Sequence, residues 1–330
     1  HTYFNTAGKK LIYEDGVVRG VIVEDKDGAQ TEVRASAVII GTGGFMGSPE
    51  LQKKYTSYEN NVNIFFSRQR PNICGDGMKM AWEIGAGRSE MMVDVYKGMP
   101  IYCGPMGTKE EWALLADPNL MVNRCGERFI DENCERYYLA NAIHRQPGGC
   151  AFLITAYNLS DKYKKGEKVM FGAPGMPAPL NDIDEIIAQA KALDYHYIFE
   201  GDSLDELAEN AGIDKEALEK TVAEYNAMCD AGEDNVFFKK TNLNRLDGPK
   251  FYAAQFFVDS FGALGGLKIN YRTEVITNEL KPIPGLYGAG SEANCIYAGT
   301  YPGRLSGNTS GFAYTTGVMA AESAAEYIGK

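Results

Sequence analysis

The chain has 330 residues, of which 45% are hydrophobic and 23% are charged, and its formal net charge is −11. This size and composition are ordinary for a globular protein of one large or two smaller domains. The acidic balance argues against a nucleic-acid partner, whose phosphates require clustered Lys and Arg. No apolar run approaches the roughly 20 residues that a membrane span needs, so none is expected.

The numbers and spacing of the cysteines and histidines argue against a set of disulfide bonds and against a metal site. The seven cysteines form no CxxC pair, and their odd number prevents complete intramolecular pairing, so we expect free buried thiols. The three histidines are scattered, and no metal site is expected. No secretory signal is visible at the start of the chain, which opens on His1 and soon enters a strand pattern. The compartment therefore stays open between the cytoplasm and export to a bacterial periplasm.

The first predicted elements are short strands. Residues 11–13 and 17–23 flank the Asp15-Gly16 turn signal, which predicts a hairpin, and residues 30–34 predict a third strand. The apolar run Ala37–Ile40 then stops at Gly41-Thr42-Gly43-Gly44. A fully apolar strand that ends in glycines is typical of a central strand whose carboxyl end meets a ligand.

Helices and irregular segments follow. Residues 50–55 predict a short helix, and Gly75-Asp76-Gly77 predicts the start of another. Residues 94–179 are rich in Gly, Pro, Tyr and Met and show no clear period, which favours a cap whose loops line a cavity. Residues 181–231 are predicted to be helical. Within them, Ser203 followed by Glu206 predicts a capping box, and Asp214 predicts a second cap.

The last third returns to the strand pattern. Residues 265–269 and 285–290 predict strands that rejoin a sheet, and residues 311–328 predict a final helix. Its many Ala and Gly residues favour tight packing of that helix against the sheet.

Several segments, in the expected order, resemble motifs of the fumarate reductase/succinate dehydrogenase flavoprotein family. They are Ala37–Phe45, Cys74–Ala81, Val122–Glu132, Leu204–Asn226 and Gly285–Asn308. The resemblance implies an FAD-dependent oxidoreductase with α/β and α+β parts. Residues 1–95 and 259–330 would form a partial Rossmann-like FAD-binding domain, and residues 96–258 an inserted α+β capping domain.

One motif of that family is missing from the sequence. The family begins with a strand, a GxGxxG turn and a helix whose N-terminus holds the FAD pyrophosphate, and no GxGxxG follows a strand here. We therefore expect a truncated chain that holds FAD weakly or not at all by itself.

The resemblance also implies which residues contact FAD. They are Thr42, Gly43, Gly44, Asp76, Gly290, Glu292, Gly307, Asn308 and Thr309. The glycines would admit the dinucleotide to the backbone, Glu292 would bind ribose hydroxyls, and the helix after Gly307 would face the flavin. Each has a plainer alternative. The glycines suit an ordinary turn, Glu292 a solvated loop, and Asp76 and Asn308 simple helix caps.

Three residues are implied in catalysis. Arg136 lies four positions after Glu132, where fumarate reductase-like members carry the Arg that protonates the substrate carbon. Arg304 falls on the Arg that clamps a substrate carboxylate, and Tyr301 resembles the Tyr that polarises a ketone in ketosteroid dehydrogenases. The alternatives are structural. Arg136 and Arg304 suit ion pairs, the former with Glu132 or Glu135, and Tyr301 suits packing.

Departures from the family pattern limit the substrate. Neither substrate-binding histidine of fumarate reductases is present, because Tyr96–Met99 and Phe261–Gly266 occupy their places. We therefore expect reduction of an activated C=C bond in a larger unsaturated carboxylate or carbonyl compound, with a separate electron donor. Two alternatives stay open: a ketosteroid-type FAD dehydrogenase, and a non-catalytic cap fragment without flavin.

Overall fold

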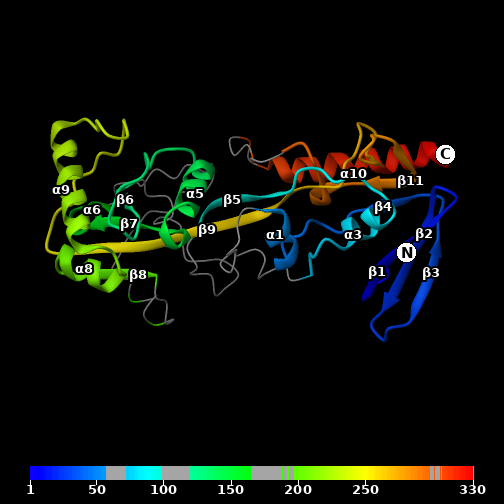
Figure 1. Cartoon of the computed structure of the whole chain (residues 1–330), viewed down its shortest axis with the longest axis horizontal. Coiled ribbons are helices and arrows are strands. Elements are labelled where there is room, and N and C mark those ends of the chain that lie inside the picture. Colours follow the sequence, from blue (N-terminus) through cyan, green and yellow to red (C-terminus); the bar gives the residue numbers. More distant parts are fainter. Residues whose placement is uncertain are drawn as a thin grey trace. The chain divides into compact units, whose positions relative to one another are not determined.

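The computed structural model describes residues 1–56, 72–98, 119–164, 197–297 and 307–329, together with residues 188, 192, 301 and 305. The chain divides into two compact units, shown along the sequence in Figure 1. The first unit comprises His1–Asp94 and Ser260–Lys330, and the second comprises Val95–Asp259. The chain passes between them within strands β5 (Met92–Gly98) and β9 (Phe251–Gly266). The assignment of cofactor and capping roles to these stretches stays a prediction.

The first unit begins with the antiparallel sheet that the turn signal predicts. Strands β1 (Thr6–Glu14), β2 (Val17–Asp25) and β3 (Gln30–Arg34) pair in that order. Asp15 and Gly16 have φ angles of 51° and 80°, the left-handed values that a two-residue hairpin turn needs.

A second sheet places two chain segments side by side. Strand β11 (Pro282–Gly288) pairs antiparallel with β10 (Glu274–Ile276) and parallel with β4 (Val38–Ile40). Helix α10 (Asn308–Tyr327) runs along β11 and β4, as Figure 1 shows in red. Its small residues Ala320 and Ala324 are buried in one cluster with residues of and after β11, which confirms the tight packing expected of this helix.

Two short α-helices, a 3-10 helix and a two-residue strand also belong to the first unit. Helix α1 (Pro49–Tyr55) begins after Ser48, whose side chain accepts a hydrogen bond from the Leu51 N–H. Helix α3 (Asp76–Glu83) begins after Gly75, which is left-handed with φ 76°. After the short helix η3 (Gly290–Glu292), strand β12 (Ala293–Asn294) pairs with the end of β9.

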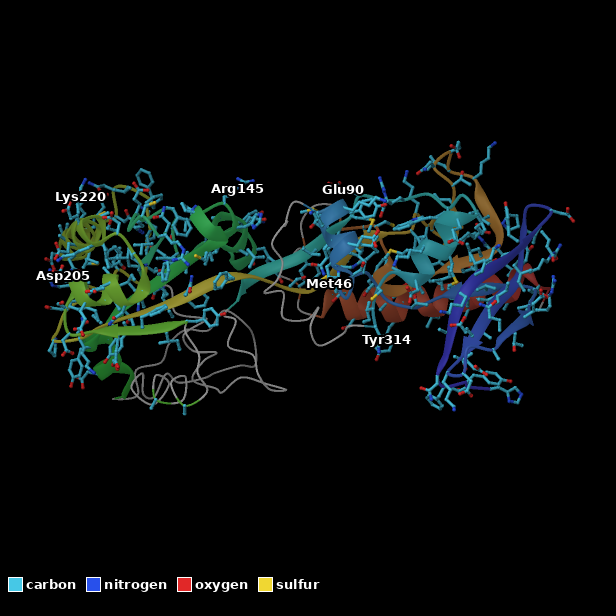
Figure 2. The ribbon with its side chains drawn as sticks, turned by 60° about the horizontal axis from the view of Figure 1, so that its bottom comes forward. Met46, Glu90, Arg145, Asp205, Lys220 and Tyr314 are labelled. Carbon is cyan, nitrogen blue, oxygen red and sulfur yellow. The ribbon has the colours of Figure 1, made fainter. Side chains whose placement is uncertain are left out.

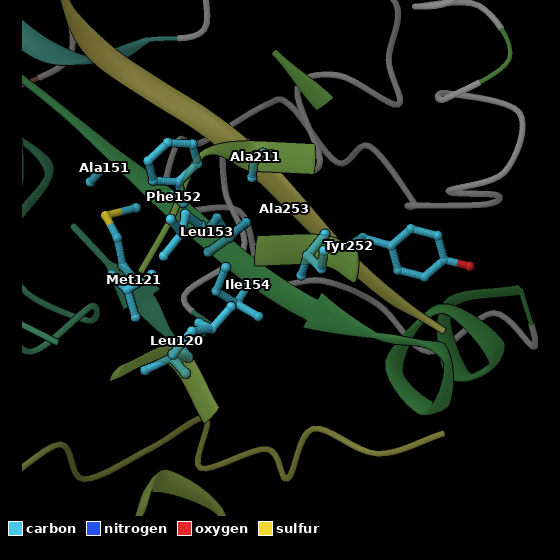
Figure 3. Packing of buried hydrophobic residues seen from close by; sticks show 14 of the residues in the cluster. Leu120, Met121, Ala151, Phe152, Leu153, Ile154, Ala211, Tyr252 and Ala253 are labelled. Carbon is cyan, nitrogen blue, oxygen red and sulfur yellow. The ribbon is translucent and has the colours of Figure 1, made fainter. Parts of the chain in front are cut away.

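The second unit is built on a mixed core of strands and helices. Strand β7 (Cys150–Ala156) is buried at all seven positions and lies antiparallel between β6 (Met121–Val122) and the first half of β9. Figure 3 shows Phe152, Leu153 and Ile154 of β7 packed among Leu120, Met121 and Ala253. The prediction of irregular structure over residues 94–179 was therefore wrong for the described part. A strand buried on both faces lacks the alternating pattern that reveals a strand.

Helices cover this sheet. Helices α5 (Arg136–His144) and α6 (Tyr157–Lys164) flank β7 in the chain, with the short turn η2 (Pro147–Gly149) between them. The predicted helical stretch 181–231 lies partly outside the described residues. In the rest, Ile198–Gly201 is strand β8, paired with β9, which corrects the prediction there. Its four residues form a strand because they pair with β9, and this distant pairing leaves no signal in the local sequence pattern.

Helices α8 (Leu204–Ala211) and α9 (Lys215–Ala231) have the predicted starts. The Ser203 side chain accepts from the Glu206 N–H at 3.1 Å, and Asp214 accepts from the Ala217 N–H at 2.9 Å. The Glu206 carboxylate reaches back to the Asp202 N–H rather than to Ser203. Figure 2 shows the exposed side chain of Lys220 on α9 and that of Tyr314 on α10.

Three further findings concern the described part of the chain as a whole. None of its helices is long and apolar enough to cross a membrane. None of its His, Cys, Asp and Glu residues gather into a metal-binding group. Its six cysteines are free, as expected, but only Cys150 among them is fully buried and Cys125 is exposed, so the expected burial was wrong for most of them.

Candidate functional site

The loops after β4 and β11 meet at one edge of the sheet. Because the two strands are parallel, with Ile40 opposite Gly288, their carboxyl ends lie together. The Ala289 N–H continues the ladder by donating to the Ile40 carbonyl at 3.0 Å. This brings Thr42, Gly43 and Gly44 next to the turn that contains Glu292, in the place where ligands bind to open α/β sheets.

Thr42 links three segments at this edge. Its backbone N–H donates to one carboxylate oxygen of Glu292, and its hydroxyl donates to the other oxygen at 2.8 Å. The same hydroxyl accepts from the Gly77 N–H, in the first turn of α3, at 3.1 Å. A single hydroxyl therefore joins the β4 loop, the β11 turn and the start of α3.

Glu292 is completely buried rather than solvated, so the loop-acid alternative was wrong. Burial, opposed by hydrogen bonds from Thr42 and Gly43 and helped by the charge of Asp76, raises the pKa of Glu292 to about 7. Both carboxylate oxygens point to Thr42. The structure thus shows Glu292 as a tie between loops, while its implied contact with ribose stays a prediction.

Glycines at this site allow neighbouring segments to pack closer than a side chain would permit. A Cβ on Gly44 would lie 2.4 Å from the Ala263 Cβ, and one on Gly77 would lie 2.8 Å from a Glu292 oxygen. Gly43 and Gly290 have φ angles of 89° and 73°, values that other residues rarely adopt. Gly290 also donates its N–H to the Thr316 hydroxyl of α10 at 3.0 Å.

The start of α10 lacks a side-chain cap. Gly307, with φ 78°, precedes the first helical residue Asn308, so Asn308 is not the cap that its type allowed. The Thr309 N–H donates to the Tyr301 hydroxyl at 3.3 Å. Tyr301 is 9% exposed and packs against Tyr297 at a ring distance of 5.3 Å. Likewise Asp76 is the exposed first residue of α3 and Gly75 is its cap.

The implied catalytic arginines are only partly described. Arg136 is the first residue of α5, directly after the cap residue Glu135, whose side chain accepts from the Tyr137 N–H. The described part of Arg136 is its backbone, and Arg304 lies outside the described residues. Their catalytic roles stay predictions.

A buried ionic cluster precedes α5 and was missed by the sequence reasoning. Arg128 contacts Glu132 at 2.9 Å and Asp234 at 2.7 Å, and Lys239 contacts Glu132 at 3.1 Å. All four side chains are at most 6% exposed. The one local signal was the i, i+4 spacing of Arg128 and Glu132. Asp234 and Lys239 lie about a hundred residues further along the chain, where no local pattern points to the partnership.

Charge in this cluster is set by its partners. Burial raises the pKa of Asp234, but hydrogen bonds from Arg128 and from the Phe237 and Val236 N–H groups outweigh burial and hold it well below its usual range. Burial lowers the pKa of Arg128, and its bonds to Glu132 and Asp234 raise it overall. Asp234 and Arg128 are therefore both ionised at neutral pH.

The residues at this edge of the first unit are compatible with the dinucleotide cofactor that the sequence resemblance implies. Gly41 and Thr42 are exposed at the carboxyl end of β4, and a Cβ on Gly41 or Gly307 would meet nothing within 4 Å. The first turn of α10 begins without a side-chain cap, and a helix N-terminus favours electron-rich groups. Open glycine backbone beside parallel strand ends and a helix start together suit a phosphate-bearing cofactor.

Comparison with known proteins agrees with this geometry. The profile of the FAD binding domain family matches residues 1–309. The chain is 31% identical over 329 residues to fumarate reductase (cytochrome) of Shewanella frigidimarina, across 99% of this chain and 52% of that protein. It is 28% identical over 358 residues to 3-oxosteroid 1-dehydrogenase of Mycobacterium tuberculosis, across 99% of this chain and 60% of that protein.

A solved structure supports the same relationship. The open conformation of a flavocytochrome c3 fumarate reductase matches with a TM-score of 0.64 and 25% identity, over 98% of this chain and 52% of that one. The chain thus spans about half of this structure and of the fumarate reductase, and 60% of the oxosteroid dehydrogenase.

Proposed function

The chain belongs to the FAD binding domain family, and from this membership we propose that it is part of a flavoenzyme that reduces an activated C=C bond. The observation that carries the proposal is the position of Arg136 at the start of α5. The similar protein of Shewanella frigidimarina, named a fumarate reductase, supports a reductase of this type. The function proposed is that of an ene reductase acting on an unsaturated carboxylate or carbonyl compound.

The hydrogen bonds of Glu132 argue against an ion pair between Glu132 and Arg136. A carboxylate offers about four acceptor positions. Glu132 already accepts from the Met121 N–H at 3.1 Å, from two nitrogens of Arg128 at 2.9 Å, and from Lys239 at 3.1 Å. Its capacity is therefore filled, and Glu132 does not need Arg136 as a hydrogen-bond partner. Of the two carboxylates considered as ion-pair partners of Arg136, Glu132 is therefore the less suitable one.

FAD would be held in the first unit by the loop Thr42–Gly44, by Gly290 and by the start of α10 at Gly307–Thr309. When bound, FAD supplies the hydride that adds to the β carbon of the substrate. The chain's own residues do the rest. Arg136 delivers the proton to the adjacent carbon, Arg304 holds a carboxylate through a bidentate contact, and Tyr301 donates to a carbonyl oxygen.

The substrate class follows from what replaces the histidines of fumarate reductases. Tyr96–Met99 and Phe261–Gly266 are more apolar than the family pattern. A substrate larger than fumarate, aromatic or polycyclic, with one carboxylate or carbonyl, suits them. Reduction also requires an electron donor that restores the flavin.

The test is the variant Arg136→Lys, made in the longest available form of the protein with its flavin content measured first. Positioned proton transfer contributes about 10²–10⁴-fold, so alkene reduction should fall by that factor while flavin content stays unchanged. The matched control is Arg145→Lys, at the other end of α5, which should keep full activity. Turnover of enoates with a reduced viologen is the measurement. Normal turnover by Arg136→Lys would show that Arg136 is not the acid.

A second candidate, ketone-directed dehydrogenation, is favoured by Tyr301. Its hydroxyl lies at the start of α10, where it accepts the Thr309 N–H at 3.3 Å. The similarity to 3-oxosteroid 1-dehydrogenase supports this alternative. Arg304→Gln should raise KM by roughly 10–150-fold for a carboxylate substrate, because a charged hydrogen bond is lost. For a neutral ketone, Tyr301→Phe should be the damaging change instead.

The third possibility, a flavin-free binding fragment, is tested by the absorbance spectrum. If the longest available form of the protein carries no flavin and gains none from added FAD, both enzymatic proposals fail.

A further inference from the structure

The segment that connects α9 to β9 contacts the start of α5. Residues Asp234–Asn242 follow α9, and residues Arg128–Glu135 precede α5, about a hundred positions earlier in the chain. Both segments belong to the second unit. We call Asp234–Asn242 the clamp segment.

Ionic contacts form one half of the attachment. Lys239 of the clamp segment, which is 1% exposed, contacts Glu132 at 3.1 Å, and Asp234 contacts Arg128 at 2.7 Å. Asp234 also accepts the N–H groups of Val236 and Phe237 at 2.9 and 3.0 Å, so it shapes the clamp segment itself. The ionic contacts join both ends of Arg128–Glu132 to the same segment.

Amide contacts form the other half, one residue nearer to α5. The Asn133 side chain donates to the Thr241 carbonyl at 2.8 Å and accepts from the Asn242 side chain at 2.8 Å. Its backbone N–H donates to the Asp131 side chain at 2.9 Å. Asn133 is therefore held by both of its amide atoms and by its backbone, three residues before Arg136.

The clamp segment adopts an uncommon backbone conformation. Phe238 and Asn242 have φ angles of 59° and 58°, in the left-handed region that a bulky residue such as Phe rarely enters. Such conformations persist where surrounding contacts hold them, and they concentrate at functional sites. Here the surrounding contacts are those to Glu132 and Asn133.

We propose that the clamp segment positions Arg136 by fixing the residues that lead into α5, and that Asn133, Lys239 and Asn242 are positioning residues for proton transfer. This inference rests on the proposed role of Arg136. Arginine has a pKa above about 12 and is a poor acid, so proton transfer from it depends on close placement at the reacting carbon. A displacement of about 1 Å at the reacting atoms lowers a rate by as much as roughly 10²-fold. The buried ionic contacts of Arg128 and Glu132, together with the two amide contacts of Asn133, would fix the start of α5 to this accuracy.

The decisive variant is Asn133→Ala in the FAD-loaded protein. Its matched control is Asn226→Ala, because Asn226 in the same unit also makes two amide contacts, donating to the Leu246 carbonyl at 2.9 Å and accepting the Leu246 N–H at 2.8 Å. Asn226 lies on α9, and both of these contacts are with Leu246 rather than with the residues before α5. Both variants lose one donor and one acceptor, so a general loss of stability affects them alike.

The expected result is a roughly 10–100-fold lower kcat for Asn133→Ala, with unchanged KM and flavin content and a larger solvent deuterium isotope effect. Amide exchange at Tyr137–Leu139 should speed up in Asn133→Ala alone. Asn226→Ala should keep kcat and the isotope effect. If Asn133→Ala does not fold, Asn242→Gly deletes the partner amide while tolerating the left-handed φ.

Two outcomes overturn the proposal and differ from each other. In the first outcome, Arg136→Lys is impaired, but Asn133→Ala or Asn242→Gly has the same kcat as Asn226→Ala. This result would show that the clamp segment has no positioning role, and it would leave the proposed function intact. A fully active Arg136→Lys enzyme removes the proposed proton donor and the clamp's role together.

Discussion

Glu292 in the first unit and Asp234 in the second are both buried carboxylates, and their pKa values shift in opposite directions. Glu292 of the first unit is bonded by neutral groups of Thr42, and burial raises its pKa to about 7. Asp234 of the second unit is just as buried, but Arg128 and backbone N–H groups hold its pKa well below its usual range. Burial alone therefore does not decide whether an acid is charged. The partners decide it.

This difference matches the proposed roles of the two regions. Glu292, whose pKa is about 7 and which is bonded by neutral groups of Thr42 and Gly43, joins loops that would surround a cofactor. The ionic cluster around Arg128 instead resists rearrangement, because removing one member leaves a buried charge without one of its partners.

The largest effect should come from Asp234→Asn. One oxygen of Asp234 accepts from Arg128 and the Lys239 N–H, and the other accepts from the Val236 and Phe237 N–H groups. An amide has one oxygen and no charge, so it cannot serve both sets and Arg128 loses one of its two buried anionic partners, and the second unit should lose about 3–5 kcal/mol. Amide exchange at Val236, Phe237 and Lys239 measures the loss. The matched control is Asp214→Asn at the exposed start of α9, where Asn caps as well as Asp. Equal exchange in both variants would remove the contrast with Glu292.

The next effect concerns pH and Glu292. A carboxyl with a folded pKa of about 7 and an unfolded value near 4.5 binds more protons when folded. Stability from this group is therefore full below pH about 4.5 and is lost as pH rises through about 7, by roughly 3 kcal/mol in total. Glu292→Gln should abolish that loss, which unfolding of the flavin-free protein in urea at pH 5 and pH 8 would reveal. An unchanged pH profile would mean that Glu292 is already ionised.

The smallest of the three effects concerns the Thr42 hydroxyl. Thr42→Val leaves a Glu292 oxygen and the Gly77 N–H without their partner, at a cost of about 1–3 kcal/mol. Because that hydrogen bond lowers the pKa of Glu292, its removal should also shift the pH transition upward. Thr42→Ser keeps the hydroxyl and should restore both properties. A valine variant with the wild-type transition would show that the hydroxyl does not control Glu292.

Elements with a local signal were predicted well. The hairpin turn at Asp15-Gly16 and the cap at Asp214 depend on a few adjacent residues, and both are present. Strands β7 and β8 were missed, because one is apolar on both faces and the other is short and depends on pairing with β9. Of the site, the sequence located the glycine loop at Thr42 and the turn at Glu292, but it did not reveal the bond between them, and its solvated-loop alternative for Glu292 was wrong.

The sequence by itself determined the order of motifs, and with it the FAD binding domain family, because those signals lie within short stretches. Only the tertiary structure decided the partners of the buried acids. Thr42 and Glu292 are 250 positions apart, and Asn133 and Asn242 are 109 apart. The hydrogen bonds that set the charge of Glu292 and hold the start of α5 form only after folding brings distant segments together. Their strength depends on the exclusion of water, which no single stretch of sequence encodes.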